Sequence, residues 1–161
     1  MTAVTCVRTT WPGVRYHVKF DREQLVGDVV PEQLSVLVID DDQEVVDFFQ
    51  RQLSCNDLYS FSLCQDSRDG IAALSEITPD ILIIDWMMSG QNGIDVLREI
   101  DSNPDITEPI YIAMISGAPD LELLSMIATE LGAAEVLPKP MAAKVAAAMF
   151  KRAEVRIAMG V

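Results

Sequence analysis

Four apolar runs of this sequence lead into polar residues that could take part in chemistry. These polar residues are Asp40, Asp41, Asp85, Ser116 and Lys139. Carboxylate oxygens are the hard ligands that Mg²⁺ prefers, usually together with waters and a phosphate oxygen. An amine and a hydroxyl beside such a site would hold the other phosphoryl oxygens and leave one carboxylate as the nucleophile. These residue types therefore indicate Mg²⁺-dependent phosphoryl transfer to an aspartate.

The acidic triplet Asp40, Asp41 and Asp42 supports a cation at this place. Two carboxylates about 4 Å apart repel by several kcal/mol at the effective dielectric of a protein surface. A cation, a proton or solvent must relieve that repulsion. Asp42 has no chemistry assigned to it, and we expect its side chain to cap the helix that begins at Gln43.

The elements that carry these residues decide whether they meet. Short runs that are apolar throughout are typical of strands buried on both faces, and here they alternate with longer helical patterns. We expect strands at residues 36–39, 59–64, 81–84, 110–115 and 135–137, and helices at 44–53, 70–77, 94–100, 121–131 and 141–159. This order predicts an α/β fold, a three-layer, doubly wound (βα)5 unit with a five-stranded parallel sheet. Ligands of such sheets bind at the carboxyl ends of the strands, so the polar residues should converge there.

Four stretches of the chain match a known family. They are VLVIDDD, ILIIDWMMSGQNGIDVL, IAMISGA and EVLPKP, in the family's order and close to its spacing. Over about residues 34–159 the chain resembles the receiver domain of bacterial two-component response regulators. The resemblance implies the flavodoxin-like receiver fold and a phosphoprotein that carries an aspartyl phosphate in a phosphorelay.

The resemblance also implies a role for each residue of the site. Asp85 would be the phosphoacceptor. Asp41 and Asp85 would bind Mg²⁺ directly, with Asp40 acting largely through water. The backbone carbonyl of Met87 would complete the protein's share of the metal shell.

The remaining residues of the resemblance concern the phosphoryl group and the backbone. Ser116 would bond one phosphoryl oxygen, and Lys139 would pair with another. Gly93 matches the glycine that follows the loop after the third strand, and Lys139-Pro140 matches the family's cis peptide.

Two positions depart from the family pattern. Ser89 stands where the family usually has proline, and we expect it to loosen the loop without touching a metal ligand. Val136 stands where many members have Tyr or Phe, so the usual aromatic switch should be absent. We therefore expect phosphorylation to be retained but read out differently, through the loop at residues 117–119.

Composition narrows the class of protein. The chain has 12 basic and 25 acidic residues, which gives a formal net charge of −13. This balance argues against nucleic-acid and anionic-membrane surfaces, because these need clustered Lys and Arg. No apolar run approaches the length of about 18 residues that a membrane helix needs. The first residues lack a basic region followed by an apolar one, so we expect no signal peptide. The three cysteines lack CxxC spacing, so we expect a cytoplasmic protein with neither disulfides nor zinc.

The resemblance divides the chain into two parts. Residues 34–161 form the receiver domain, whereas residues 1–33 are an N-terminal extension that is either a β-hairpin or disordered. Because only 22 residues follow Lys139, we expect no output domain and therefore a stand-alone receiver.

The expected partners are proteins. The resemblance implies a histidine kinase or histidine phosphotransfer protein as phosphodonor, facing Val45, Phe48, Phe49 and Met141, and a downstream protein target. The helix at 141–159 carries a second apolar stripe, which fits a homodimer face, although its alanines could equally fill a broad core face.

Three functions stay open on the sequence. The first is a phosphorylated signalling module, which is not an enzyme beyond self-catalysed phosphoryl transfer and autodephosphorylation. The second is a pseudo-receiver, an interaction module that is never phosphorylated. The third is a Mg²⁺ phosphatase of the haloacid-dehalogenase type with its nucleophile at Asp40, which leaves Asp85 unexplained.

Overall fold

The structure is a computed structural model that describes residues 5–11, 14–20, 27–31, 33–103 and 110–159. Its elements belong to two separate sheets. Three antiparallel strands come first along the chain: β1 (Thr5–Trp11), β2 (Val14–Phe20) and β3 (Gly27–Pro31). Strands β1 and β2 pair antiparallel, and a β-hairpin is one of the two predictions for this part of the chain. Strand β3 was not predicted. The division of the chain into domains stays a prediction.

The second sheet has five parallel strands, as predicted. In chain order they are β4 (Leu34–Ile39), β5 (Tyr59–Cys64), β6 (Ile81–Asp85), β7 (Tyr111–Ser116) and β8 (Glu135–Pro138). The order across the sheet is β5-β4-β6-β7-β8, so the chain reverses its direction of travel between β4 and β6. In doubly wound sheets a crevice for ligands opens at this reversal, beyond the carboxyl ends of the strands.

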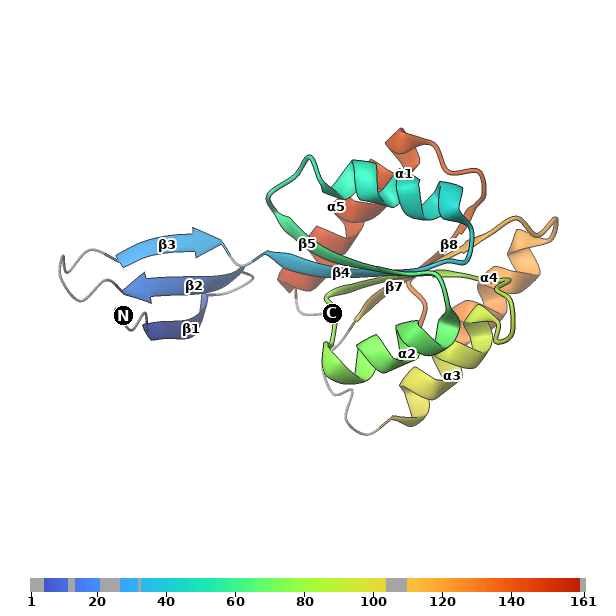
Figure 1. Cartoon of the computed structure of the whole chain (residues 1–161), viewed down its shortest axis with the longest axis horizontal. Helices are drawn as coiled ribbons and strands as arrows, with labels where there is room; N and C mark the ends of the chain where they lie inside the picture. Colours follow the sequence, from blue (N-terminus) through green and yellow to red (C-terminus); the bar gives the residue numbers. More distant parts are fainter. Residues whose placement is uncertain (1–4, 12–13, 21–26, 32, 104–109, 160–161) are drawn as a thin grey trace.

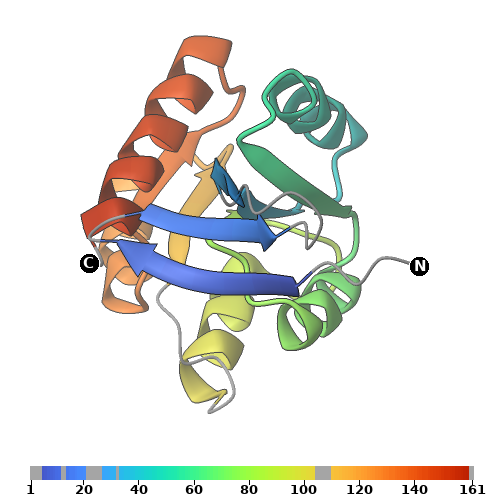
Figure 2. The same ribbon diagram turned by 90° about the vertical axis from the view of Figure 1, so that its left-hand side faces the viewer.

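Helices cover both faces of this sheet (Figure 1). They are α1 (Gln43–Leu53), α2 (Ser67–Glu76), α3 (Gly93–Ser102), α4 (Leu121–Glu130) and α5 (Ala143–Met159). Helices α1 and α5 lie on one face, and α2, α3 and α4 lie on the other. Figure 2 shows the same separation from the side, with α1 and α5 in cyan and red and α2 and α3 in green and yellow. The predicted three-layer α/β fold is therefore confirmed.

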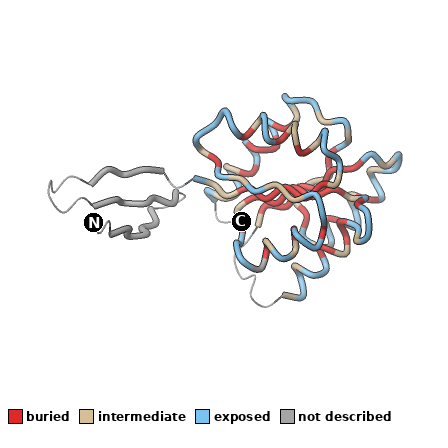
Figure 3. The backbone as a smooth tube through the Cα atoms, viewed as in Figure 1, coloured by how far each residue is buried: buried red, intermediate tan, exposed pale blue. Residues whose placement is uncertain are grey.

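Alternating side chains of the central strands fill two cores. Val36 and Val38 of β4 belong to the cluster that includes α1 and α5 residues, whereas Leu37 and Ile39 belong to the cluster on the other face. Successive residues of a strand point to opposite faces, so a run that is apolar throughout can serve both cores. Figure 3 shows the buried residues concentrated along these strands. The packed sheet thus fixes the positions of the residues at the carboxyl ends of its strands.

Side-chain caps fix where the helices start. Asp42 accepts a hydrogen bond from the N–H of Glu44 at 2.9 Å and is the N-cap of α1, as predicted. Asp66 caps α2 in the same way, and the helix begins at Ser67 rather than at residue 70. Helix α5 begins at Ala143, two residues later than predicted. Among the described residues no helix is both long and apolar enough to span a membrane.

Candidate phosphoryl-transfer site

Backbone ladders bring the predicted residues to one edge of the sheet. The N–H of Trp86 donates to the carbonyl of Ile115, which fixes the end of β6 beside β7. The N–H of Lys139 donates to the carbonyl of Ser116 and fixes the end of β8 in the same way. Asp40 at the end of β4 is joined through its N–H to the carbonyl of Cys64. The strand ends are therefore held by hydrogen bonds before any side chain of the site is considered.

Three carboxylates meet at this edge. Asp40, Asp41 and Asp85 each place an oxygen within 4.8 Å of the oxygens of the other two. Asp40 and Asp85 are buried, with 0% and 4% of their surface exposed, whereas Asp41 is only partly buried. Three negative charges so close together repel one another, and burial strengthens that repulsion.

Lys139 is the cation that faces the two buried carboxylates. Its Nζ lies 2.8 Å from Asp40 Oδ2 and 3.0 Å from Asp85 Oδ1. It also donates a hydrogen bond of 3.0 Å to Asp40 Oδ1. One amine is thus shared between two acids and offsets part of their charge.

The ionisation of the site reflects this balance. Burial raises the pKa of Asp40 to about 6, against the lowering effect of Lys139. Burial also raises the pKa of Asp85, and Lys139 again opposes it. Burial disfavours the charge on Lys139, but its hydrogen bonds to both acids outweigh this and raise its pKa. The lysine is therefore a stable cation, and the two buried carboxylates carry the electrostatic cost.

The donor set fits a hard divalent cation. Asp40 Oδ2 is buried and accepts no hydrogen bond from the described residues, because Lys139 approaches that oxygen outside hydrogen-bond geometry. The single ammonium of Lys139 stands against three clustered carboxylates, so the cluster keeps a net negative charge that a divalent cation would offset. Oxygen ligands of this kind are those of Mg²⁺ sites. The residues present therefore fit the metal that the sequence analysis expects.

Asp41 is held by the loop that follows β6. The N–H and the hydroxyl of Ser89 donate to Asp41 Oδ2 at 2.7 and 2.8 Å. The hydrogen bond from the Ser89 N–H lowers the pKa of Asp41. The expectation that Ser89 touches none of the predicted metal ligands is therefore wrong, because it bonds Asp41, which lies 48 residues earlier in the chain. Sequence reasoning missed the contact because nothing local to either residue signals it.

The remaining predicted residues lie on neighbouring strand ends. Ser116 is buried, with 1% of its surface exposed, and its Oγ accepts a hydrogen bond from the N–H of Ala118 at 3.0 Å. The backbone of Met87 lowers the pKa of Asp85 against the effect of burial, and Met87 itself is 70% exposed. Val136 is half-buried against the core of α2, α3 and α4. The Lys139–Pro140 peptide is cis.

Gly93 lets α3 approach the strand that carries Asp85. Its N–H donates to the carbonyl of Trp86, and a Cβ at this position would lie 2.5 Å from the backbone oxygen of Asp85. A side chain there would also meet Met114 Cε at 3.1 Å. Only glycine allows this closeness, because the backbone oxygen cannot move aside cheaply.

We therefore predict that Gly93→Ala lowers the free energy of unfolding by about 1–3 kcal/mol, the usual cost of overpacking. Urea denaturation followed by circular dichroism measures the change. Gly117→Ala is the matched control, because a Cβ there meets no atom within 4 Å. An equal loss in both variants would contradict the close approach as the cause.

A hollow of about 510 Å³ adjoins the site between α1 and the start of α5. Its apolar lining includes Val45, Phe48, Pro140 and Met141, and Lys139 reaches it from the acidic site. The rest of its wall is formed by Asp42, Glu44, Asp47, Arg51 and Ile115. Phe49, which the sequence analysis groups with this surface, is instead fully buried in the core.

Comparison with known proteins places this geometry in a family. The model of the response regulator receiver domain matches residues 36–151. A response regulator named MprA from Mycolicibacterium vanbaalenii is 35% identical over 107 residues, which are 66% of this chain and 44% of that protein. MprA from Mycobacterium avium is 33% identical over 109 residues, which are 68% of this chain and 46% of that protein. The chain thus matches less than half of the length of these relatives.

Solved structures of receiver domains have the same fold. A response regulator receiver domain protein from Clostridium thermocellum superposes with a TM-score of 0.67 and is 27% identical, covering 76% of this chain and 95% of its own. A CheY-like receiver domain protein from Methanospirillum hungatei has a TM-score of 0.69 at 18% identity, covering 78% of this chain and 97% of its own. With its five-stranded parallel sheet and its acidic cluster at the strand ends, the chain belongs to the family of response regulator receiver domains.

Proposed function

We propose that this receiver domain accepts a phosphoryl group on Asp85 in a Mg²⁺-dependent reaction and signals through protein contacts. The observation that carries the proposal is Lys139 bridging Asp40 and Asp85 beside a third carboxylate. Asp85 is the acid that stands alone at the end of its strand, next to the amine that a phosphoryl oxygen would need. Asp40, Asp41, Asp85 and the backbone carbonyl of Met87 are the proposed metal ligands.

The chain's own residues account for most of the chemistry. An oxygen of Asp85 attacks phosphorus, a P–O bond forms, and the bond from phosphorus to the donor's leaving group breaks. Lys139, already 3.0 Å from Asp85, is placed to pair with a phosphoryl oxygen. Ser116 supplies a hydroxyl from the neighbouring strand. Bound Mg²⁺ would supply positive charge that offsets the carboxylates and the phosphoryl oxygens.

The hollow beside α1 supports a protein as the phosphodonor. Its apolar lining lies next to Lys139. A helix that presents a phosphohistidine could therefore bury apolar side chains in the hollow while its phosphoryl group reaches the acidic site. A histidine kinase or a histidine phosphotransfer protein has this chemistry. Val45, Phe48 and Met141 are the contacts that we propose for it. The downstream protein target would respond to the loop at residues 117–119.

Two alternatives have their own observations. A pseudo-receiver would keep the fold and leave Asp85 unphosphorylated, and the absence of an aromatic at Val136 is the feature that favours it. A phosphatase would use Asp40 as nucleophile, and this would leave Asp85 and its ion pair with Lys139 without a role. The acidic cluster and the lysine favour the phosphorylated receiver over both.

We expect the full chain to form a covalent phosphoryl adduct when it is incubated with Mg²⁺ and acetyl phosphate. Intact-mass spectrometry detects the adduct, which should be stable in acid and labile in base because it is an acyl phosphate. EDTA should abolish its formation, since the three carboxylates would then lack the cation that offsets their charge. A chain that binds Mg²⁺ but never forms the adduct would be a pseudo-receiver.

A further inference from the structure

Asp41 differs from the other two acids of the cluster in how its position is fixed. Asp40 and Asp85 are buried at the ends of their strands, so packing restricts their side chains. Asp41 lies two residues beyond the end of β4 and is only partly buried. A partly exposed side chain can adopt several rotamers, and ordering one of them costs conformational entropy. Something other than packing must therefore hold this carboxylate toward the cluster.

The two hydrogen bonds from Ser89 meet that need. The backbone N–H and the hydroxyl both end on Oδ2, at 2.7 and 2.8 Å. Each carboxylate oxygen has about two lone-pair sites, so Oδ2 can accept both bonds. Neither donor from Ser89 therefore occupies Oδ1. Two donors on Oδ2 fix the orientation of the carboxylate, and Ser89 leaves Oδ1 to the side of the acidic cluster without a donor of its own.

We infer that Ser89 is a positioning residue that orients Asp41 for a divalent cation and raises the affinity of the acidic cluster for Mg²⁺. The inference rests on the proposed function for the assignment of Asp41 as a ligand. Outer residues that hydrogen-bond to a metal ligand fix its orientation, and losing one typically weakens the affinity for the metal by tenfold or more.

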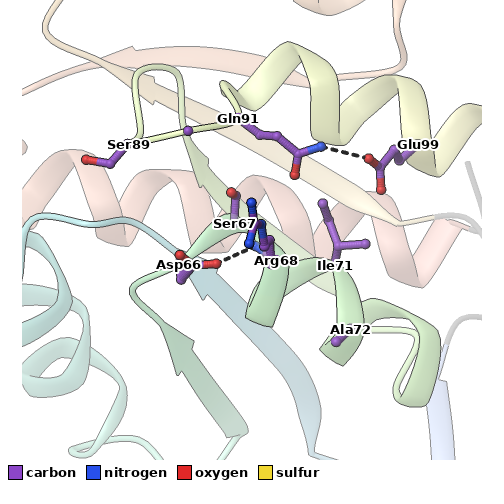
Figure 4. Close-up of a pocket in the computed structure, with 9 residues that line it drawn as sticks. Asp66, Ser67, Arg68, Ile71, Ala72, Ser89, Gln91 and Glu99 are labelled. Carbon is purple, nitrogen blue, oxygen red and sulfur yellow. Dashed lines mark hydrogen bonds between the residues drawn. The ribbon is translucent and has the colours of Figure 1, made fainter.

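Ser89 can be substituted without disturbing the core, because it is exposed. Ser89 is exposed and lies in the wall of a hollow of about 830 Å³ between the loop after β6 and the start of α2. Figure 4 shows its hydroxyl pointing away from Gln91. Because Ser89 is exposed, a smaller side chain there leaves no buried cavity. Ser89→Ala removes the hydroxyl donor, and Ser89→Thr keeps it.

The test is a titration of the full chain with Mn²⁺, in which electron paramagnetic resonance measures the free ion and Mg²⁺ competes for the site. We expect Ser89→Ala to weaken the binding of both ions by about tenfold. Ser89→Thr should retain the affinity to within about threefold, because it retains the hydroxyl. Ser102→Ala is the matched control, since Ser102 is exposed and, within the part of the chain that the structure describes, its hydroxyl donates to the carbonyl of Glu99 in the same helix.

A second measurement does not involve a metal. The amide proton of Ser89 should shift upfield in Asp41→Ala, because it loses its bond to a charged oxygen, and nuclear magnetic resonance in EDTA shows this. An unmoved amide, an unchanged or stronger affinity in Ser89→Ala, or an equal loss in Ser102→Ala would overturn the inference. A wild-type chain that binds neither ion, or that binds them equally well as Asp41→Ala, would overturn the proposed metal ligands as well.

Discussion

Asp85→Asn is expected to abolish the phosphoryl adduct that forms with Mg²⁺ and acetyl phosphate, with a rate lower by at least about two orders of magnitude. The amide keeps the shape of the side chain but lacks the negative oxygen that attacks phosphorus. The fold should survive, because the change removes one buried charge from a cluster of three. Intact-mass spectrometry over a time course measures the rate, and thermal unfolding checks the fold.

The matched control is Asp101→Asn, which removes an exposed carboxylate near the far end of α3. It should form the adduct at the wild-type rate. An adduct that persists in Asp85→Asn but is lost in Asp40→Asn would identify Asp40 as the nucleophile and favour the phosphatase. Loss in both variants at undiminished stability still agrees with Asp85 as acceptor, since Asp40 is a proposed metal ligand.

The strands and the convergence of their polar ends could be predicted because both depend on local pattern. A run such as residues 81–84 is apolar throughout, and this indicates burial on both faces before any partner is known. Parallel strands end at one edge of a sheet, so Asp40, Asp85 and Lys139 could be expected at the same edge before the strand order was known. Helix starts were also local, as Asp42 and Asp66 show by capping the next turn.

Contacts between distant side chains could not be predicted. Ser89 reaches Asp41 across 48 residues, and the hydroxyl of Tyr59 reaches Glu154 across 95. Each of these two contacts depends on how separate loops or elements pack once the core has formed. The sequence around either residue does not indicate its partner. The serine at position 89 departs from the family pattern, but this departure alone did not predict its hydrogen bonds to Asp41. The functional detail of this site therefore lies in its loops more than in its strands.

Lys139→Met is expected to make the stability of the metal-free protein strongly dependent on pH. The lysine faces two buried carboxylates at 2.8 and 3.0 Å, and removing one partner of a buried ion pair commonly costs 3–5 kcal/mol. Methionine keeps much of the volume of the side chain and leaves Asp40 and Asp85 without their cation. At pH 8, in EDTA, we expect a loss of about 3 kcal/mol in the free energy of unfolding.

The sign of the pH effect follows from Asp40. Burial raises its pKa to about 6, above the value of 3.8 that an unperturbed aspartate has. Between these values the folded chain binds more protons than the unfolded chain, so stability increases as pH falls through 6 and decreases as pH rises through it. Lys139 lowers the pKa of Asp40, so the variant should shift this window upward. The cost of Lys139→Met should therefore shrink to about 1 kcal/mol or less near pH 5, where Asp40 can be neutral.

Urea denaturation measures the cost of Lys139→Met at pH 5 and at pH 8. Two further variants test whether this cost comes from the ion pair of Lys139 with Asp40. Lys144→Met removes an exposed lysine of α5 and should change the free energy of unfolding by no more than about 0.5 kcal/mol at either pH. In an Asp40→Asn background, Lys139→Met should cost less at pH 8 and depend less on pH, because only Asp85 is then left as a buried acid without its cation. A cost that is equal at both pH values, or unchanged by Asp40→Asn, would show that Lys139 stabilises the fold by packing and not by offsetting buried charge.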